Sequence, residues 1–200
     1  MFFKRAQRDD AADAVGWLVV GLGNPGAEYA HTRHNAGFET VDRLAEEWGV
    51  SYWKTECGAV TGKARQLGES IVLAKPQSFM NTSGGPVKQL LAKYRLGPDR
   101  LIVIHDELDI PAGTVRVKFG GGHAGHNGLR SIVEKTGTKD WYRVRIGIGR
   151  PPGRMPVVDF VLSKPKGEAL EDFEFAVGRG ADAVGSLIEN GLEKTQQLYN

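Results

Sequence analysis

Short apolar runs alternate along this chain with segments whose apolar residues recur at helical spacing. Six runs have the length and branching expected of strands: residues 17–20, 58–66, 70–75, 101–104, 114–118 and 142–148. Three segments have apolar residues at helical spacing: residues 38–48, 87–94 and 170–187. A further helix is expected over residues 125–136. Interleaved strands and helices are typical of α/β domains. We therefore expect a single α/β domain with a twisted, mixed and mostly parallel central sheet flanked by helices.

The 200 residues fit one domain, which we expect to span residues 16–200 because no linker or repeat interrupts that range. Residues 1–15 lack the apolar core of a signal peptide, and we expect them to form a flexible extension. The one cysteine, Cys57, excludes an internal disulfide and suits a reducing compartment. No apolar run approaches the roughly 18 residues of a membrane span. The expected location is therefore the cytoplasm.

Basic residues alternate with apolar ones in two of the expected strands. The formal net charge is only +2, so contact with a nucleic acid would require a local patch of this kind. Arg116 and Lys118 lie two apart in one strand, as do Arg143 and Arg145 in the other, and side chains two apart share a face. We expect these four side chains to point away from the core. A phosphate-contacting strip and a solvated sheet face both fit this pattern.

Asparagine occurs in three glycine-rich turns: Asn24 within residues 21–26, Asn81 within 79–84 and Asn127 within 122–128. Glycine lets a backbone approach a ligand closely. An amide side chain donates and accepts hydrogen bonds without carrying charge. Several amides gathered near one imidazole would suit a polar, uncharged group such as an ester or a peptide.

Residues 21–26 also match the Gly-x-Gly-x-x-Gly fingerprint of dinucleotide-binding proteins. That function would require a helix beginning at Gly26 and an acidic residue about 20 positions later, at a second strand. Residues 27–37 instead resemble a turn, and Asn24 favours a tight turn that presents an amide. A nicotinamide-dependent oxidoreductase is kept only as an alternative.

His34 and Asp106 are the candidate catalytic pair. Asp106 follows the apolar run 101–104, at the sheet end where open α/β folds place their ligand crevice. A carboxylate there could hold the His34 imidazole in one tautomer and stabilise its protonated form. An imidazole with a pKa near 6.5 suits a general base at neutral pH. The alternative is that Asp106 only caps a turn with residues 109–111.

No nucleophile completes a triad, because the chain has no Gly-x-Ser-x-Gly elbow and Cys57 lies in an expected strand without a histidine nearby. If His34 acts as a base, its proton donor is therefore water. The implied reaction is direct hydrolysis of an activated acyl bond, with Asn24 or Asn81 polarising the carbonyl.

His123 and His126 are spaced so that both could bind a metal. The sequence near them has neither cysteines nor a series of carboxylates, which disfavours that interpretation. We instead expect a turn and a helix N-terminus that offer backbone N–H groups and the Asn127 amide. We expect no metal and no cofactor.

Five segments together resemble the bacterial peptidyl-tRNA hydrolase family: residues 21–38, 75–84, 105–113, 120–129 and 145–151. They occur in order, and the resemblance extends over about residues 17–190. The chain departs from the family pattern in its N-terminal extension and at Ala124, where glycine is expected.

This resemblance implies a monomeric enzyme that cleaves the ester between a peptide, or an N-blocked aminoacyl group, and the 3′-terminal ribose of tRNA. It implies His34 as the general base and Asp106 as its partner. The other implied roles are these: Asn24, Asn81 and Asn127 position peptide and water, Met80 and His126 line the site, Tyr29 borders the terminal nucleotide, and Lys118 and Arg145 clamp the tRNA 5′-phosphate. A mobile lid over the crevice is also implied. The implied partner is peptidyl-tRNA, bound through its acceptor stem and 3′ end. A non-catalytic tRNA-binding module that uses the same basic strip is the alternative from another class.

Overall fold

The computed structural model describes residues 14–200, so all but the last two residues of the predicted extension 1–15 lie outside the described part. The strands are β1 (Trp17–Gly21), β2 (Lys54–Glu56), β3 (Ala59–Gln66), β4 (Glu69–Pro76), β5 (Leu101–Glu107), β6 (Val115–Phe119) and β7 (Tyr142–Gly147). The helices are α2 (Ala36–Glu47), α3 (Gly84–Lys93), α4 (Asn127–Thr136), α5 (Val157–Val161), α6 (Glu168–Asn190) and α7 (Leu192–Tyr199). Short 3-10 helices are η1 (Arg33–Asn35), η2 (Met80–Thr82) and η3 (Pro98–Arg100).

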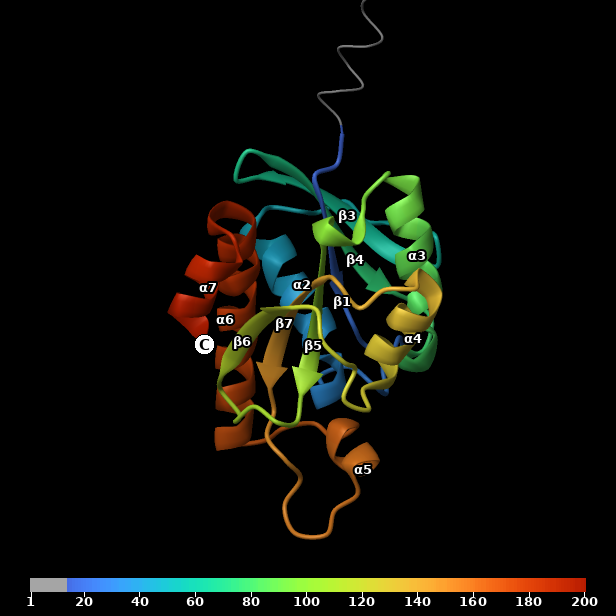
Figure 1. Ribbon diagram of the computed structural model, residues 1–200. Helices are drawn as coiled ribbons and strands as arrows, with labels where there is room; N and C mark the ends of the chain where they lie inside the picture. Colours follow the sequence, from blue (N-terminus) through green and yellow to red (C-terminus); the bar gives the residue numbers. More distant parts are fainter. Residues whose placement is uncertain (1–13) are drawn as a thin grey trace, which may run out of the picture.

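The seven strands form one sheet in the order β2-β3-β4-β1-β5-β7-β6 (Figure 1). β1 pairs in parallel with β4 and β5, and β5 pairs in parallel with β7. The antiparallel pairs lie toward the two edges, where β3 joins β2 to β4 and β6 pairs with β7. Of the seven strands, β3 and β6 are therefore antiparallel to the other five. The predicted mixed, mostly parallel sheet is confirmed.

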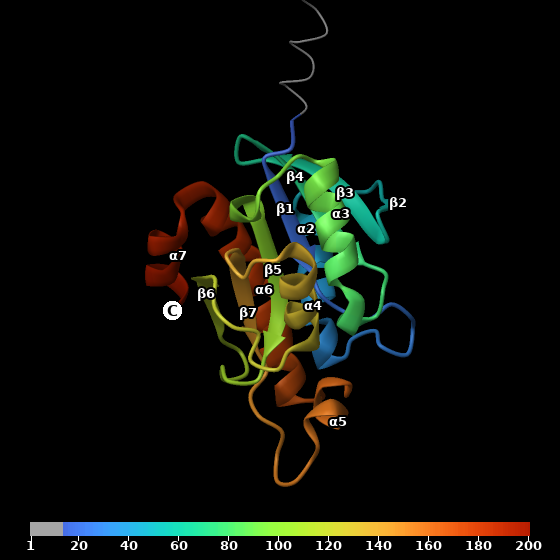
Figure 2. The ribbon, with the colours of Figure 1, turned by 45° about the vertical axis from the view of Figure 1, so that its right-hand side comes forward.

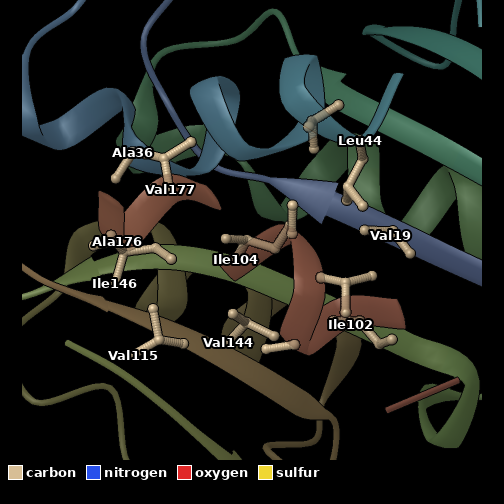
Figure 3. Packing of buried hydrophobic residues seen from close by; sticks show 14 of the residues in the cluster. Val19, Ala36, Leu44, Ile102, Ile104, Val115, Val144, Ile146, Ala176 and Val177 are labelled. Atoms are coloured by element: carbon tan, nitrogen blue, oxygen red, sulfur yellow. The ribbon is translucent and has the colours of Figure 1, made fainter. Parts of the chain in front are cut away.

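Helices cover both faces of the sheet, so its central strands are apolar on both sides. Trp17 and Val19 of β1 pack on one face with α2 and α6, whereas Leu18 and Val20 pack on the other with α3 and α4. Figure 2 shows α3 and α4 in front of the sheet and α2 and α6 behind it. Figure 3 shows the packing on the α2–α6 side. None of the helices in the described range is both long and apolar enough to cross a bilayer.

α7 covers the open edge of the sheet at β6. The side chain of Asn200, which follows α7, accepts a hydrogen bond from the Val117 backbone N–H at 2.8 Å and donates to the Val117 carbonyl at 3.0 Å. These two bonds replace the partners that a further strand would supply, so the edge is not left open to pairing.

A close backbone approach brings the His34 segment against the sheet. Gly21 of β1 pairs with Ile104 of β5, so the chain leaves both strands at the same end of the sheet. The first turn of α2 packs directly on this end. A Cβ atom on Gly37 would lie 2.3 Å from the Leu22 backbone nitrogen and 2.4 Å from the Ile104 carbonyl oxygen. Glycine at position 37 is therefore what lets η1, with His34, lie beside the end of β5.

Three elements differ from the sequence-based expectation. β2 is short and polar, α5 follows a loop rich in proline and glycine, and Gly191 separates α7 from α6. Each is too short for apolar periodicity to reveal it. The placement of Cys57 in a strand was wrong, because Cys57 lies in the β2–β3 turn with φ 53°.

We predict that Gly37→Ala destabilises the fold by about 2–4 kcal/mol, because the new methyl group overlaps backbone atoms that cannot move independently. The free energy of unfolding from urea titration measures this. Gly85→Ala is the matched control: nothing lies within 4 Å of its added Cβ, so it should change stability by less than about 1 kcal/mol. Equal effects of the two substitutions would contradict the close approach.

Candidate active site

A cavity of about 500 Å³ opens at the end of the sheet where β5 stops. Several separate segments line it: η1 through His34, β5 through Asp106, and the β1 turn, η2 and the start of α4 through Asn24, Met80, Asn81, His126 and Asn127. The structure thus brings the three asparagine-bearing turns and the His34–Asp106 pair to one cavity.

His34 and Asp106 are in direct contact. Nδ1 of His34 lies 2.9 Å from Oδ2 of Asp106. An ionised carboxylate only accepts hydrogen bonds, so the proton lies on Nδ1. In the neutral ring, Nε2 then carries the unshared electron pair. Since His34 lines the cavity, the geometry provides a proton acceptor there.

A second histidine contacts the other oxygen of the same carboxylate. Nε2 of His126 lies 2.8 Å from Oδ1 of Asp106. The Nδ1 atom of His126 accepts hydrogen bonds from the backbone N–H groups of Gly128 and Leu129, which makes His126 the N-cap of α4. The hydrogen bonds therefore assign the His126 proton to Nε2. Asp106 thus accepts hydrogen bonds from two imidazoles whose ring centroids lie 5.1 Å apart.

These hydrogen bonds determine the charges in the site. Burial alone would lower the pKa of His34, but the charge and hydrogen bond of Asp106 outweigh it and raise that pKa above its ordinary value. Burial alone would raise the pKa of Asp106, but His34 and His126 hold it well below its usual range. Burial lowers the pKa of His105, the next residue along β5, to about 3, with His126 adding to the effect. His105 therefore stays neutral against the His126 ring, at a centroid distance of 5.1 Å.

Asn24 is held in place at both its backbone and its side chain. Its backbone N–H donates to Oδ1 of Asn35 at 2.8 Å, and its carbonyl accepts from Nδ2 of Asn35 at 3.1 Å. Its Oδ1 accepts from the Met80 backbone N–H at 2.7 Å. With the oxygen occupied in this way, the Asn24 amide nitrogen is the group left to donate into the cavity.

The other predicted site residues divide into two groups. Asn81 and Asn127 are exposed side chains on the cavity wall, and Met80 is buried beside them. Tyr29 is not among the lining residues but packs edge-on against Phe79 at 6.3 Å, next to the η2 wall. Lys118 and Arg145 also lie outside the cavity, on β6 and β7.

The prediction that Arg143 belongs to an outward-facing basic strip was wrong. Its side chain is fully buried and stacks 4.0 Å from the Trp141 ring centroid. Its guanidinium donates to the carbonyls of Gly122 at 2.6 Å and Gly121 at 2.5 Å. These carbonyls make burial of the cation possible, and strand alternation cannot reveal them. Arg143 thus holds the loop that leads to His126.

Lys118 and Arg145 form a concentration of positive charge next to this loop. Burial lowers the pKa of Lys118, and the nearby Arg145 and Arg143 lower it further. Burial likewise lowers the pKa of Arg145, whose Nε is buried without a hydrogen-bond partner among the described residues. The Glu107 carboxylate acts in the opposite direction on both pKa values, but burial outweighs it. Clustered, partly buried cations of this kind favour a bound anion.

One group of residues has the spacing to hold a metal ion within the described range, namely His34, Asp106 and His126, whose ligand atoms lie within 4.8 Å of one another. His123, predicted with His126 as an alternative pair, is not part of it; its Nδ1 accepts from the Gly125 backbone N–H at 3.0 Å. Both ring nitrogens that face Asp106 carry protons in this hydrogen-bond pattern. A metal would have to displace both protons.

Sequence reasoning missed the apolar wall of the cavity. Val157, Val158, Val161 and Leu162 line it from α5 and the residue after it. The available signal was the pair of valines after Pro156, in a loop too rich in glycine and proline to predict a helix.

The Gly21–Gly26 segment does not have the structure of a dinucleotide-binding site. Such a site would require a helix that begins at Gly26, whereas α2 begins at Ala36.

We predict that Asp106→Asn lowers the pKa of His34, because losing the carboxylate charge leaves burial as the main influence. NMR titration of the His34 ring signals measures the change. Asp109→Asn is the matched control, since this exposed carboxylate also borders the cavity but does not contact His34. An unchanged His34 pKa in Asp106→Asn would show that the pair does not interact in solution.

The family model described as "Peptidyl-tRNA hydrolase" matches residues 18–200. A protein of that name from Frankia alni is 52% identical over 184 residues, covering 92% of this chain and 93% of its own length. One from Streptomyces coelicolor is 49% identical, covering 92% of this chain and 94% of its own. The crystal structure of peptidyl-tRNA hydrolase from Acinetobacter baumannii superposes with a TM-score of 0.85 at 36% identity, covering 92% of this chain and 94% of that one. This chain belongs to the peptidyl-tRNA hydrolase family.

Proposed function

We propose that this chain is a cytoplasmic, monomeric esterase that releases free tRNA from peptidyl-tRNA, or from N-blocked aminoacyl-tRNA, without a metal or cofactor. Membership of the family supports the substrate class. The observation that carries the proposed chemistry is the 2.9 Å contact of His34 Nδ1 with Asp106, which leaves Nε2 of a cavity-lining imidazole as the proton acceptor.

The reaction begins with water attacking the ester carbonyl carbon while Nε2 of His34 takes the water proton. Asp106 stabilises the resulting imidazolium. The Asn24 amide nitrogen, fixed by its oxygen's bond to Met80, donates to the developing oxyanion. The bond from the acyl carbon to the ribose O3′ then breaks, and the His34 proton passes to that oxygen. The products are a free carboxylic acid and a free 3′-hydroxyl.

Asn81 and Asn127 account for a preference for blocked amines. Their amides lie exposed on the cavity wall and suit the peptide group that links the last residue to the rest of the chain. An ordinary aminoacyl-tRNA presents a free cationic amine instead. It would leave these amides without their acyl partners, which disfavours its binding.

The tRNA contacts extend beyond the cavity. Lys118 and Arg145 would bind the 5′-phosphate of the acceptor stem, where crowded cations favour an anion. Tyr29, packed next to the η2 wall, would border the terminal nucleotide. The acceptor stem and 3′ end would thus lie between the basic strands and the cavity.

We predict that His34→Ala lowers turnover of N-acetyl-aminoacyl-tRNA by about 10²–10⁴-fold while tRNA binding is retained, because the variant lacks the base but keeps the contacts to tRNA. Release of free tRNA under single-turnover conditions measures this. His31→Ala is the control, since His31 is exposed and pairs with Glu39. Near-normal turnover by His34→Ala would remove His34 from its role. Binding without any product by the unmodified protein would support the non-catalytic tRNA-binding alternative.

We predict that Lys118→Ala and Arg145→Ala weaken tRNA binding and each reduce the slope of log affinity against log salt by about 1, as loss of one phosphate contact requires. Filter binding over a range of salt concentrations measures the slope. Arg179→Ala, on α6 against Tyr199, is the control and should leave the slope unchanged. An unchanged slope in both strand variants would mean that these side chains only face solvent.

A further inference from the structure

The wall that α5 contributes to the cavity is apolar and open. Val157 and Val158 are 41% and 64% exposed, whereas Phe160 of the same helix is 7% exposed and packs into the core. Val158 lines the cavity that also contains His34. Exposed apolar side chains inside a polar cavity indicate contact with an apolar part of a ligand.

α5 contacts the core through Phe160 and Val161 but is set off from the sheet. Figure 1 shows it in the long connection between β7 and α6, beyond the end of the sheet. No strand pairing holds it in place, since α5 is not part of the sheet. Its position relative to His34 therefore depends on contacts other than strand pairing.

Arg33, the residue before His34, makes those contacts. Its Nη1 donates to Ser163 Oγ at 2.5 Å and lies 3.4 Å from each of the Phe160 and Ser163 carbonyl oxygens. Its guanidinium lies 4.2 Å from the Phe160 ring centroid. Its backbone N–H also donates to the Ser163 carbonyl, at 3.1 Å. One residue thus ties the catalytic turn to a helix about 130 positions away in the sequence.

Carbonyl acceptors at the end of a helix suit a cation, and a planar guanidinium can stack on a ring while its N–H groups donate hydrogen bonds in the guanidinium's own plane. Arg33 satisfies both requirements at once. Because His34 is its neighbour in η1, this side chain helps to set the spacing between His34 and the valines of α5, together with the Arg33–Ser163 backbone hydrogen bond and the packing of Phe160.

We propose that Arg33 is a positioning residue that fixes the α5 wall relative to His34, and that this wall binds the side chain of the amino acid esterified to tRNA. The inference rests on the function proposed above. Under this inference, the protein binds a peptidyl-tRNA more tightly when the amino acid esterified to the tRNA is apolar and branched than when it is glycine.

Arg33→Met tests this, because it keeps the length and apolar stem of the side chain and removes the guanidinium. The substrates are N-acetyl-leucyl and N-acetyl-glycyl esters of one and the same tRNA. In the unmodified protein the leucyl ester should have the lower KM, by about fivefold or more. Arg33→Met should raise the leucyl KM about fivefold and the glycyl KM less than about twofold, with kcat nearly unchanged for both, as expected when uniform binding is lost.

Three comparisons separate positioning from a general structural defect. Arg179→Met removes another ring-stacked arginine, from α6, and should leave both KM values unchanged. Arg33→Lys should restore part of the leucyl KM, since an ammonium can still donate to Ser163. Val158→Thr keeps the shape of an exposed wall residue, adds a hydroxyl and should raise only the leucyl KM, which keeps the test available if Arg33→Met fails to fold.

The inference is overturned if Arg33→Met changes neither KM or changes both by the same factor. It is also overturned if Val158→Thr leaves the leucyl KM unchanged. Failure of the unmodified protein to hydrolyse either ester would instead contradict the proposed function itself, and these two failures are distinguishable in a single set of assays.

Discussion

The buried carboxylate of Asp106 accepts a hydrogen bond from a different imidazole at each of its oxygens, and the arrangement of the whole cavity follows from this. A buried charge is costly unless it is paired and hydrogen-bonded. His34 and His126 supply the hydrogen bonds, although they lie about 90 residues apart in the sequence. The same bonds fix the tautomer of each ring. The hydrogen-bond pattern therefore determines which ring nitrogens carry protons as well as where the rings lie.

Support for this carboxylate reaches into the fold on both sides. Parallel pairing of β5 with β1 and β7 brings Asp106 to the end of the sheet, and Gly37 lets the His34 turn approach it. On the other side, Arg143 holds the glycine-rich loop that leads to His126. Arg33 ties the His34 turn to α5. The polar side chains and the apolar wall of the cavity thus share a common framework although they are widely separated in the sequence.

Much of this could be predicted from the sequence, because apolar periodicity reports which residues face a core. It predicted the mixed sheet and its main helices and put Asp106 at the carboxyl end of a buried strand. The pairing of Asp106 with His34 rested instead on the residue types and on the family resemblance. Periodicity failed at Arg143, because alternation reports a strand's two faces but not the carbonyls that make an inward cation stable. It also missed α5 and the contacts of Arg33 with Phe160 and Ser163, since these contacts join segments about 130 residues apart. No local pattern carries such information.

Neutron diffraction from deuterated crystals, grown at a pH where His34 is neutral, would test the central claim directly by locating protons. The account predicts deuterium on Nδ1 of His34 and on Nε2 of His126, with none on Nε2 of His34 or on Asp106. Deuterium on Nε2 of His34 together with an unprotonated Nδ1 would contradict it, because the imidazole would then offer the cavity a donor where the proposed chemistry needs a base.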